Sequence, residues 1–517
     1  MDLSSAFRIT AARRPGALAI VDGALRRTFS EWEGDIRAVA GGLARLGLKE
    51  GDHLLLVVKN RYEMATLYWA CHALGVIFTP INWRSSAADV AYCLENSGAT
   101  ALAFEGVSET SAREAAGRHP DALNLIAVAD ASADGATAFS TLADGPALPA
   151  LLARNAQDTC MMLYTSGTTG RPKGVPRSHA NEMAASVSQI AHNRYVFGDS
   201  AIGVMPLYHT MGVRVLLAAA LLNGTFVCLP TYDPDQLMTL VARERISTMF
   251  LVPTLYFDIL RHPRFGGFDR SSLTRIGYAG MTMTTALTEE ILAAFRPELF
   301  VNYYGSSEIY TFAFCDHLDR KPGCAGRAGL NQQIRVVRAS ATATVGPDDV
   351  VPAGESGEII ASLSSPEAFR GYWHRPEADA KALRGGWYFT GDLGAFDEDG
   401  ELYVLGRVDD MIVSGGENIH AEEVEDALAR CDLVSSVAVV GVPDDRMGQK
   451  VVAFVEPASS DASPEALDRF CAESGLARFK RPRAYVLVEA IPRSPVGKIL
   501  RRELRAGNYR AWTSGHG

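Results

Sequence analysis

The sequence lacks the features that mark a secreted or disulfide-rich protein. Its eight cysteines form no C-x-x-C pair, and in a chain of 517 residues we expect scattered buried thiols rather than a disulfide framework. Residues Met1–Ser5 have no basic region followed by an apolar run, so we expect no signal peptide. Together these absences favour a cytoplasmic location.

Long apolar runs and an excess of basic residues are also missing. The most apolar stretch, 213–229, is interrupted by Arg214 and by Asn223, so it is too short to cross a bilayer and predicts a buried helix, a turn and a buried strand. Lys+Arg is 50 and Asp+Glu is 60, a formal net charge of −10. This balance argues against a nucleic-acid-binding protein, which would show a basic face.

The chain is too long for one hydrophobic core, because single cores rarely exceed roughly 250–300 residues. In the first part, short apolar runs alternate with helical patterns. Strands are predicted at 53–58, 76–80 and 100–104, with a helix at 63–74 that ends near Gly75. Strands that alternate with helices indicate an α/β fold with parallel-rich sheets.

The pattern of predicted helices and strands changes after residue 395. Residues 400–407 predict an exposed hairpin strand, the acids Asp409 and Asp410 follow, and Ser463 before Pro464 is a typical helix start. We therefore expect a small α+β domain at the C-terminus. The predicted domains are 1–407 and 408–517.

A loop rich in glycine and hydroxyl residues is the most informative motif. It runs from Tyr164 to Gly174 and follows a predicted strand. Glycines allow close backbone approach to an anion, hydroxyls donate to phosphate oxygens, and lysine adds a positive charge. The loop is not a Walker A motif, because Arg171 and Pro172 separate Gly170 from the lysine. The candidate phosphate-binding residues are Thr165, Ser166, Gly167, Thr168, Thr169 and Lys173.

This loop resembles the signature loop of the adenylate-forming superfamily, which includes acyl-CoA synthetases, peptide-synthetase adenylation domains and firefly-type luciferases. Further family motifs follow in the same order, so the resemblance covers nearly the whole chain. They are Met205–His209, Asn302–Glu308, Tyr388–Asp392, Gly406–Asp410 and Pro495–Arg502. The resemblance implies a large N-terminal domain with a small β-barrel-like subdomain, and a small mobile C-terminal domain.

The resemblance also implies the nucleotide site. Tyr304 would stack on adenine beside Ala279 and Gly280, and Ser307 keeps the hydroxyl of the threonine that the family usually has there. Glu308 would bind Mg²⁺, since a hard cation prefers a carboxylate oxygen.

The resemblance implies roles for five more positions. Asp392 and Arg407 would contact the ribose of ATP. Asp409 would be the hinge, and Lys498 would be the catalytic lysine together with His209.

The acceptor is expected to be free coenzyme A, because few residues follow Lys498 and no carrier domain does. Candidate CoA-binding residues are Arg84, Gly415, Gly416, Phe479, Arg481 and Arg483. A solvated basic face is an equal explanation for the last three. A carrier-protein acceptor, a luciferase-like oxygenase and a nucleotide-binding regulator on an inactive scaffold stay open as alternatives.

Among family members, the chain most resembles 4-chlorobenzoate:CoA ligase-like aryl-CoA ligases, although Met447 stands where they have a tryptophan near the CoA nucleotide. The acyl-pocket residues implied by motif position are His209, Thr210, Met211, Ala279, Tyr303, Gly305 and Tyr310. Tyr303 is bulkier than the aliphatic residue of those ligases, so we expect a small flat acid, benzoate-like or furoate-like. A short-chain, medium-chain or alicyclic acid is the alternative. The protein is expected to be a monomer or homodimer that uses ATP, Mg²⁺ and coenzyme A.

Overall fold

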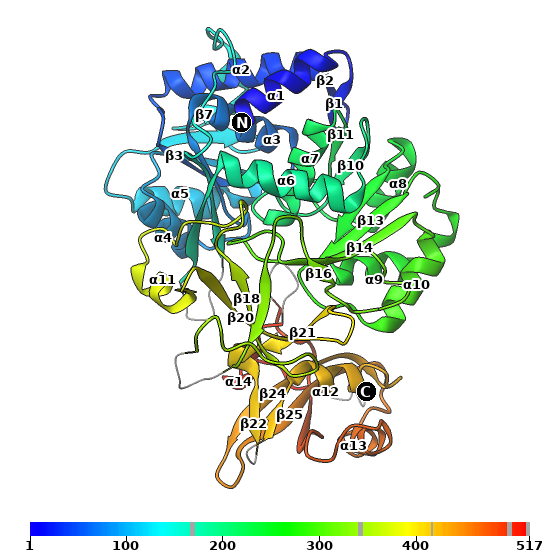
Figure 1. Cartoon of the computed structure of the whole chain (residues 1–517). Coiled ribbons are helices and arrows are strands. Elements are labelled where there is room, and N and C mark those ends of the chain that lie inside the picture. Colours follow the sequence, from blue (N-terminus) through cyan, green and yellow to red (C-terminus); the bar gives the residue numbers. More distant parts are fainter. Residues whose placement is uncertain (166–170, 340–344, 415–416, 494–498, 513–517) are drawn as a thin grey trace.

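Four β-sheets organise the chain in the computed structural model (Figure 1), which describes residues 1–165, 171–339, 345–414, 417–493 and 499–512. Within these residues the largest sheet has nine strands, and its central strands β1, β11, β10, β12, β13 and β14 run parallel. Its spatial order is β16 (Arg327–Ala328), β15 (Ala313–Cys315), β14 (Leu299–Tyr304), β13 (Arg275–Ala279), β12 (Thr248–Leu251), β10 (Ser200–Gly203), β11 (Thr225–Cys228), β1 (Leu18–Asp22), β2 (Leu25–Thr28).

A second sheet of seven described strands is parallel except for the final hairpin of β8 and β9. Its order is β7 (Thr137–Ala138), β6 (Asn124–Val128), β5 (Ala101–Glu105), β3 (His53–Val57), β4 (Ile77–Pro80), β8 (Thr159–Thr165), β9 (Lys173–Ser178). The helices, many of which cover these two sheets, are α1 (Leu3–Arg13), α2 (Phe29–Arg45), α3 (Tyr62–Leu74), α4 (Ala87–Ser97), α5 (Glu109–Gly117), α6 (His179–Asn193), α7 (Thr210–Leu221), α8 (Pro234–Arg243), α9 (Pro253–Arg261), α10 (Thr285–Phe295), α11 (Pro376–Ala382), α12 (Ala421–Leu428), α13 (Pro464–Glu473) and α14 (Arg501–Arg505).

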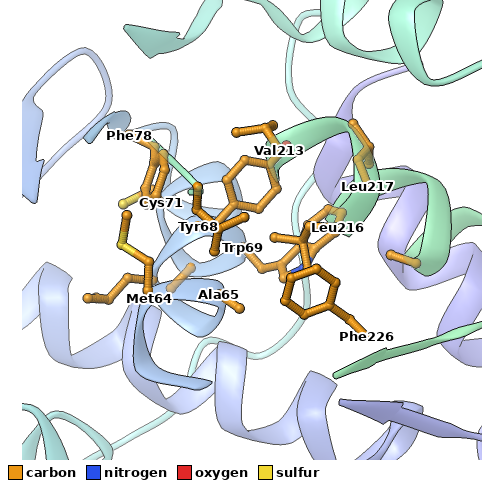
Figure 2. Packing of buried hydrophobic residues seen from close by; sticks show 14 of the residues in the cluster. Met64, Ala65, Tyr68, Trp69, Cys71, Phe78, Val213, Leu216, Leu217 and Phe226 are labelled. Atoms are coloured by element: carbon orange, nitrogen blue, oxygen red, sulfur yellow. The ribbon is translucent and has the colours of Figure 1, made fainter. Parts of the chain in front are cut away.

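Helices α3 and α7 are buried and share one core with strands of both large sheets. Figure 2 shows their apolar side chains facing one another, with Phe78 of β4 at one end and Phe226 of β11 at the other. Nearly every residue of α3 is buried, as expected for a helix that is apolar on all sides. It ends at Gly75, whose positive φ of 82° favours glycine.

The predicted local elements agree with the structure in this region. The strands at 53–58, 76–80 and 100–104 are β3, β4 and β5, each within a residue or two of the expected bounds. The stretch 213–229 lies in α7 and β11, as predicted. All eight cysteines are free and buried.

Two smaller sheets follow. The third is antiparallel and is the predicted barrel-like subdomain: β17 (Ile334–Val337), β18 (Gly357–Ser362), β20 (Trp387–Phe396), β19 (Leu383–Arg384), and β21 (Leu402–Arg407) on β20. The last belongs to the α+β unit: β23 (Glu417–Ile419), β22 (Ile412–Ser414), β25 (Gly448–Pro457), β24 (Val434–Asp444), and β26 (Ala484–Leu487) on β25.

Strand β21 differs from the expected exposed hairpin strand. It pairs with β20 as a hairpin, but Leu402 is fully buried and the rest of the strand is half-buried. A short turn, Val408–Asp410, leads from β21 to the last sheet, which lies at one end of the molecule (Figure 1). The domain boundary there and the mobility of the C-terminal domain stay predictions. In the described part of the chain, no helix has both the length and the apolar character needed to span a bilayer.

Candidate active site

The predicted phosphate-binding loop connects β8 to β9. Thr165 ends β8 and pairs with Lys173 at the start of β9. The other loop candidates, Ser166, Gly167, Thr168 and Thr169, lie outside the described residues. The strand pairing therefore fixes where the loop leaves and re-enters the sheet, and Lys173 stands at its return.

Lys173 and Glu308 both contact the side chain of Tyr372. The Lys173 ammonium lies 4.1 Å from the centre of the Tyr372 ring, and the Tyr372 hydroxyl donates a 2.6 Å hydrogen bond to Glu308 Oε1. Burial lowers the pKa of Lys173 below its usual range, while the Glu308 carboxylate acts in the opposite direction. A cation and a buried carboxylate thus share one small region, which suits a phosphate–metal complex.

A buried arginine holds the backbone beneath Glu308. Arg177 is fully buried and forms an ion pair of 2.8 Å with Glu182, which is also buried. Its Nη1 donates to the carbonyl oxygens of Glu308, at 3.1 Å, and of Glu367. These bonds fix the turn that carries Ser307 and Glu308.

The expected ribose-binding residues form one hydrogen-bonded group. Asp392 accepts from the Tyr304 hydroxyl at 2.7 Å and from Arg407 at 2.5 Å. Gly391 has a positive φ of 71°, and a Cβ there would lie 2.9 Å from the Arg407 guanidinium. The positive φ favours glycine at this position. Burial and Asp392 raise the pKa of the Tyr304 hydroxyl well above its usual range.

The expected acyl-pocket residues gather where α7 meets β13 and β14. His209 is the N-cap of α7, and its Nδ1 accepts from the Met211 amide at 3.3 Å. Beside α7, a Cβ on Gly280 would lie 3.5 Å from Val252 and 4.0 Å from the Met211 sulfur. Gly280 has φ 91° and follows Ala279, which pairs with Tyr303 across β13 and β14. The pocket residues named from motif positions are therefore neighbours in space.

The Tyr303 side chain is held by contacts on several sides. Its hydroxyl accepts a 2.7 Å hydrogen bond from Asn193, its ring meets Phe250 edge-on at 5.5 Å, and the Arg214 guanidinium lies 4.8 Å from the ring centre. Arg214 also donates to the carbonyl of Tyr310 at 3.2 Å. Gly305 packs on the same carbonyl, so a side chain there would clash. A ring held on several sides does not move easily, so the position of Tyr303 is well fixed.

The remaining candidates are expected at the coenzyme A side of the site, at the hinge and at the catalytic lysine. Arg84 is exposed and stacks on Trp83 at 3.6 Å, while Phe479, Arg481 and Arg483 lie between α13 and β26 of the C-terminal unit. Phe479 and Arg483 are exposed, and Arg481 donates to the Leu476 carbonyl. Asp409 is exposed. Gly415, Gly416 and Lys498 lie outside the described residues.

Three site residues were not found from the sequence. Tyr372 lies in no motif, Arg177 is a cation of a type that is mostly exposed, and Arg214 was predicted to lie in a buried helix but without a role in the site. The available signal was the position of Arg214 inside the apolar stretch 213–229. Their roles emerge only from the fold.

Comparison with known proteins gives matches over most of the chain. The AMP-binding enzyme family matches residues 7–373, and the AMP-binding enzyme C-terminal domain matches residues 423–498.

Individual relatives match over nearly their full length. A feruloyl-CoA synthase from Amycolatopsis sp is 34% identical, with 95% of this chain and 96% of the relative covered. A 4-chlorobenzoate–CoA ligase from Arthrobacter sp is 32% identical, covering 96% and 93%. A crystal structure of a benzoate CoA ligase from Burkholderia xenovorans LB400 is 25% identical with a TM-score of 0.86, covering 98% and 100%.

Proposed function

The chain belongs to the AMP-binding enzyme family and is an acid–thiol ligase, and from this premise we propose that it joins a small aromatic or heteroaromatic acid to coenzyme A. In the first step a carboxylate oxygen of the acid attacks the α-phosphorus of ATP, and pyrophosphate leaves. In the second, the CoA thiolate attacks the acyl carbon of the adenylate, and AMP leaves. The single observation that carries this proposal is the meeting of Lys173, Tyr372 and Glu308.

The nucleotide would lie between two groups of residues. Lys173 and the loop from Thr165 to Thr169 would hold the β- and γ-phosphates. Tyr304 would contact adenine beside Ala279 and Gly280, and Asp392 would accept from the ribose hydroxyls. In-line phosphoryl chemistry depends mainly on such positioning and charge neutralisation.

Glu308 fits the requirement of a magnesium ion. It is a buried carboxylate oriented by the Tyr372 hydroxyl and by the Arg177 bond to its own carbonyl. A hard divalent cation bound there would neutralise the charge of the triphosphate. Lys173 would add its own positive charge on the same side.

The C-terminal unit would serve both steps in turn. Lys498 would contact the carboxylate and the α-phosphate during adenylation, as a cation rather than as a base. Rotation about Asp409 would then replace Lys498 with Gly415 and Gly416, beside which the pantetheine arm would pass. Arg84, Phe479, Arg481 and Arg483 would hold the nucleotide part of CoA.

The pocket favours a small flat acid. Tyr303 is anchored by Asn193 and Phe250, so it would shorten the space beyond His209. Two relatives are named for aromatic acids, ferulate and 4-chlorobenzoate. Both observations support a ring-bearing acid over a long alkyl chain.

Polar groups near Tyr303 favour a polar substituent on that ring. Arg214 is 4% exposed, and its Nε has no hydrogen-bond partner among the described residues. The same holds for Nδ1 of His192, whose ring lies 5.8 Å from Tyr303. Buried donors and acceptors normally find a partner in protein, water or ligand. We therefore expect a hydroxyl or ring heteroatom on the substrate to be preferred to a halogen.

A substrate panel tests the proposal. The purified protein is assayed for AMP formation with ATP, CoA and each of benzoate, hydroxybenzoates, halobenzoates, furoate, cyclohexanecarboxylate, hexanoate and octanoate. We expect the highest kcat/KM with a hydroxybenzoate, benzoate or furoate. The matched variant Arg214→Met should remove the preference for a polar ring while keeping activity on benzoate. A preference for octanoate over benzoate and furoate would refute the pocket assignment, and absence of CoA-dependent AMP formation with every acid would refute the ligase reaction.

A further inference from the structure

Three potential metal ligands from one short segment converge next to the nine-stranded sheet. Cys315 ends β15, His317 lies two residues later, and Cys324 precedes β16. Their Sγ and ring-nitrogen atoms all lie within 4.8 Å of one another. Both cysteines are fully buried. The spacing C-x-H-x₆-C contains no C-x-x-C pair, so the cysteine pattern did not predict this group.

A buried carboxylate from a distant part of the chain completes the group. Glu401 is 2% exposed and directly precedes β21. Its Oε1 lies 3.4 Å from His317 Nε2, and its Oε2 lies 3.6 Å from Cys324 Sγ. Two thiols, an imidazole and a carboxylate therefore share one site.

These separations fit a tetrahedral ion. Zinc binds sulfur at about 2.3 Å and nitrogen or oxygen at about 2.0–2.2 Å, so two ligand atoms of a tetrahedral site are roughly 3.4–3.8 Å apart. The two measured separations that involve Glu401 lie in this range. The Cys315, His317 and Cys324 ligand atoms lie within 4.8 Å of one another, so they would have to close by up to about 1 Å around the ion.

The surrounding hydrogen bonds also suit a metal site. His317 Nδ1 lies 3.2 Å from the Asp316 carboxylate, which would hold the proton on Nδ1 and leave Nε2 free to bind, as in carboxylate–histidine–zinc groups. The Gly326 amide donates to Cys324 Sγ at 3.0 Å. Arg327 pairs with Glu401 Oε1 at 2.7 Å and would offset the negative charge of two thiolates and a carboxylate.

We propose that Cys315, His317, Cys324 and Glu401 form a structural site for one zinc ion. Four protein ligands make a closed site, which serves stability rather than catalysis. The ion would tie the edge of the nine-stranded sheet to β21, and β21 carries Arg407 toward Asp392 and the turn before the C-terminal unit. It is distinct from the magnesium position at Glu308, because thiolates select a soft cation and a lone carboxylate selects a hard one.

Metal content and cobalt spectroscopy test the proposal without any assay of ligase activity. The full-length protein is purified under reducing conditions, and its zinc is measured by mass spectrometry. After chelator treatment it is titrated with Co²⁺. We expect one zinc per chain, a thiolate-to-cobalt charge-transfer band with the visible bands of a tetrahedral ion, and a higher melting temperature with zinc than without.

Variants locate the ion. The double variant Cys315→Ala/Cys324→Ala should abolish the charge-transfer band, and Asp316→Asn should weaken cobalt binding by roughly 10–100-fold. The control is Cys160→Ala, because Cys160 lies in a second His and Cys cluster with His72 and His179; it should keep the band. If this control alone loses the band, the ion is bound elsewhere and the proposal is wrong. A reduced wild-type chain that retains no zinc and shows no thiolate band with Co²⁺ also overturns the proposal. So does a Cys315–Cys324 disulfide in the purified protein, if the chain binds no metal once that disulfide has been reduced.

Discussion

Arg407 and Asp392 are directly opposite one another on β21 and β20, and their side chains form a 2.5 Å ion pair. Arg407 is the last residue before the turn that leads to the C-terminal unit. The carboxylate that we propose for the ribose hydroxyls therefore also anchors the strand next to the proposed hinge. The ribose hydroxyls of a bound nucleotide would compete with Arg407 for the Asp392 carboxylate. This ion pair would therefore link the proposed ATP site to the proposed hinge.

Replacing Asp392 tests this link. In Asp392→Asn the charge-assisted bonds to ribose and Arg407 weaken, and each such bond contributes about 1.5–3 kcal/mol. We expect the KM for ATP in pyrophosphate release to rise by roughly 10–100-fold. The control Asp399→Asn changes an exposed carboxylate of the same hairpin that pairs with Lys321, and it should leave the KM unchanged. An equal effect in both variants would mean that Asp392 acts only through the hairpin.

Tyr372 gives a second test, because it orients Glu308. The variant Tyr372→Phe keeps the ring under Lys173 but loses the 2.6 Å hydrogen bond to the carboxylate. We expect the rate of adenylate formation to fall about tenfold, the scale of one hydrogen bond to a charged group, and most of the loss to be recovered at high Mg²⁺. Tyr403→Phe on β21 is the control. A loss that Mg²⁺ does not recover would contradict the role assigned to Glu308.

The fold class could be predicted because it depends on local sequence, whereas the nucleotide-site roles come from the family resemblance and stay predictions. Alternating apolar runs and helix patterns specify parallel strands and their covering helices, and Gly75 marks a helix end by its backbone freedom. The ordered motifs placed Tyr304 and Asp392 in one site, and the structure brings them to 2.7 Å.

The contacts that could not be predicted are long-range. Arg177 and Glu308 are joined across 131 positions of sequence, and Glu401 reaches Cys324 from the β20–β21 hairpin. No periodicity encodes such pairs, because they depend on how separate sheets pack. Buried charged residues are mispredicted as exposed for the same reason, because the partners that allow their burial are known only from the structure.

Arg177 provides a stability prediction. Removing one member of a buried ion pair leaves the other charge unpaired, which typically costs about 3–5 kcal/mol. We expect Arg177→Met to lower the free energy of unfolding by this amount and to lower the melting temperature. The control Arg113→Met breaks a half-exposed helix pair with Glu109 and should cost under about 1 kcal/mol. Chemical denaturation followed by circular dichroism measures both.

Glu422 predicts a pH dependence where the C-terminal unit meets β21. Burial and the neighbouring Glu425 raise the pKa of its carboxyl to about 7, although Arg501 acts in the opposite direction. Glu422 packs so closely on Gly406 that a Cβ there would clash. A carboxyl whose pKa is higher in the folded state contributes stability that is complete below its unfolded value, near 4.5, and is lost as the pH rises through about 7.

We therefore expect the melting temperature to fall between about pH 4.5 and pH 7, by an amount that corresponds to a few kcal/mol at most. Glu422→Gln should remove most of this fall. The control Glu423→Gln, which changes an exposed carboxylate paired with Lys480, should keep it. A wild-type profile that is flat or rises over this range would contradict the assignment.

The two half-reactions separate the proposed roles of Lys498 and Asp409. Lys498→Ala should slow adenylate formation by roughly 10²–10³, the scale for losing one key electrostatic group, and should largely spare thioester formation from a supplied acyl adenylate. Asp409→Pro should do the reverse, because proline fixes φ and restricts rotation at the exposed turn between β21 and β22. Pyrophosphate release without CoA measures the first step, and acyl-CoA formation from the adenylate measures the second. If Lys498→Ala slows both steps equally, the lysine stabilises the structure of the site rather than the charge of the first transition state. The proposed rotation that replaces Lys498 with Gly415 and Gly416 would then have no chemical basis.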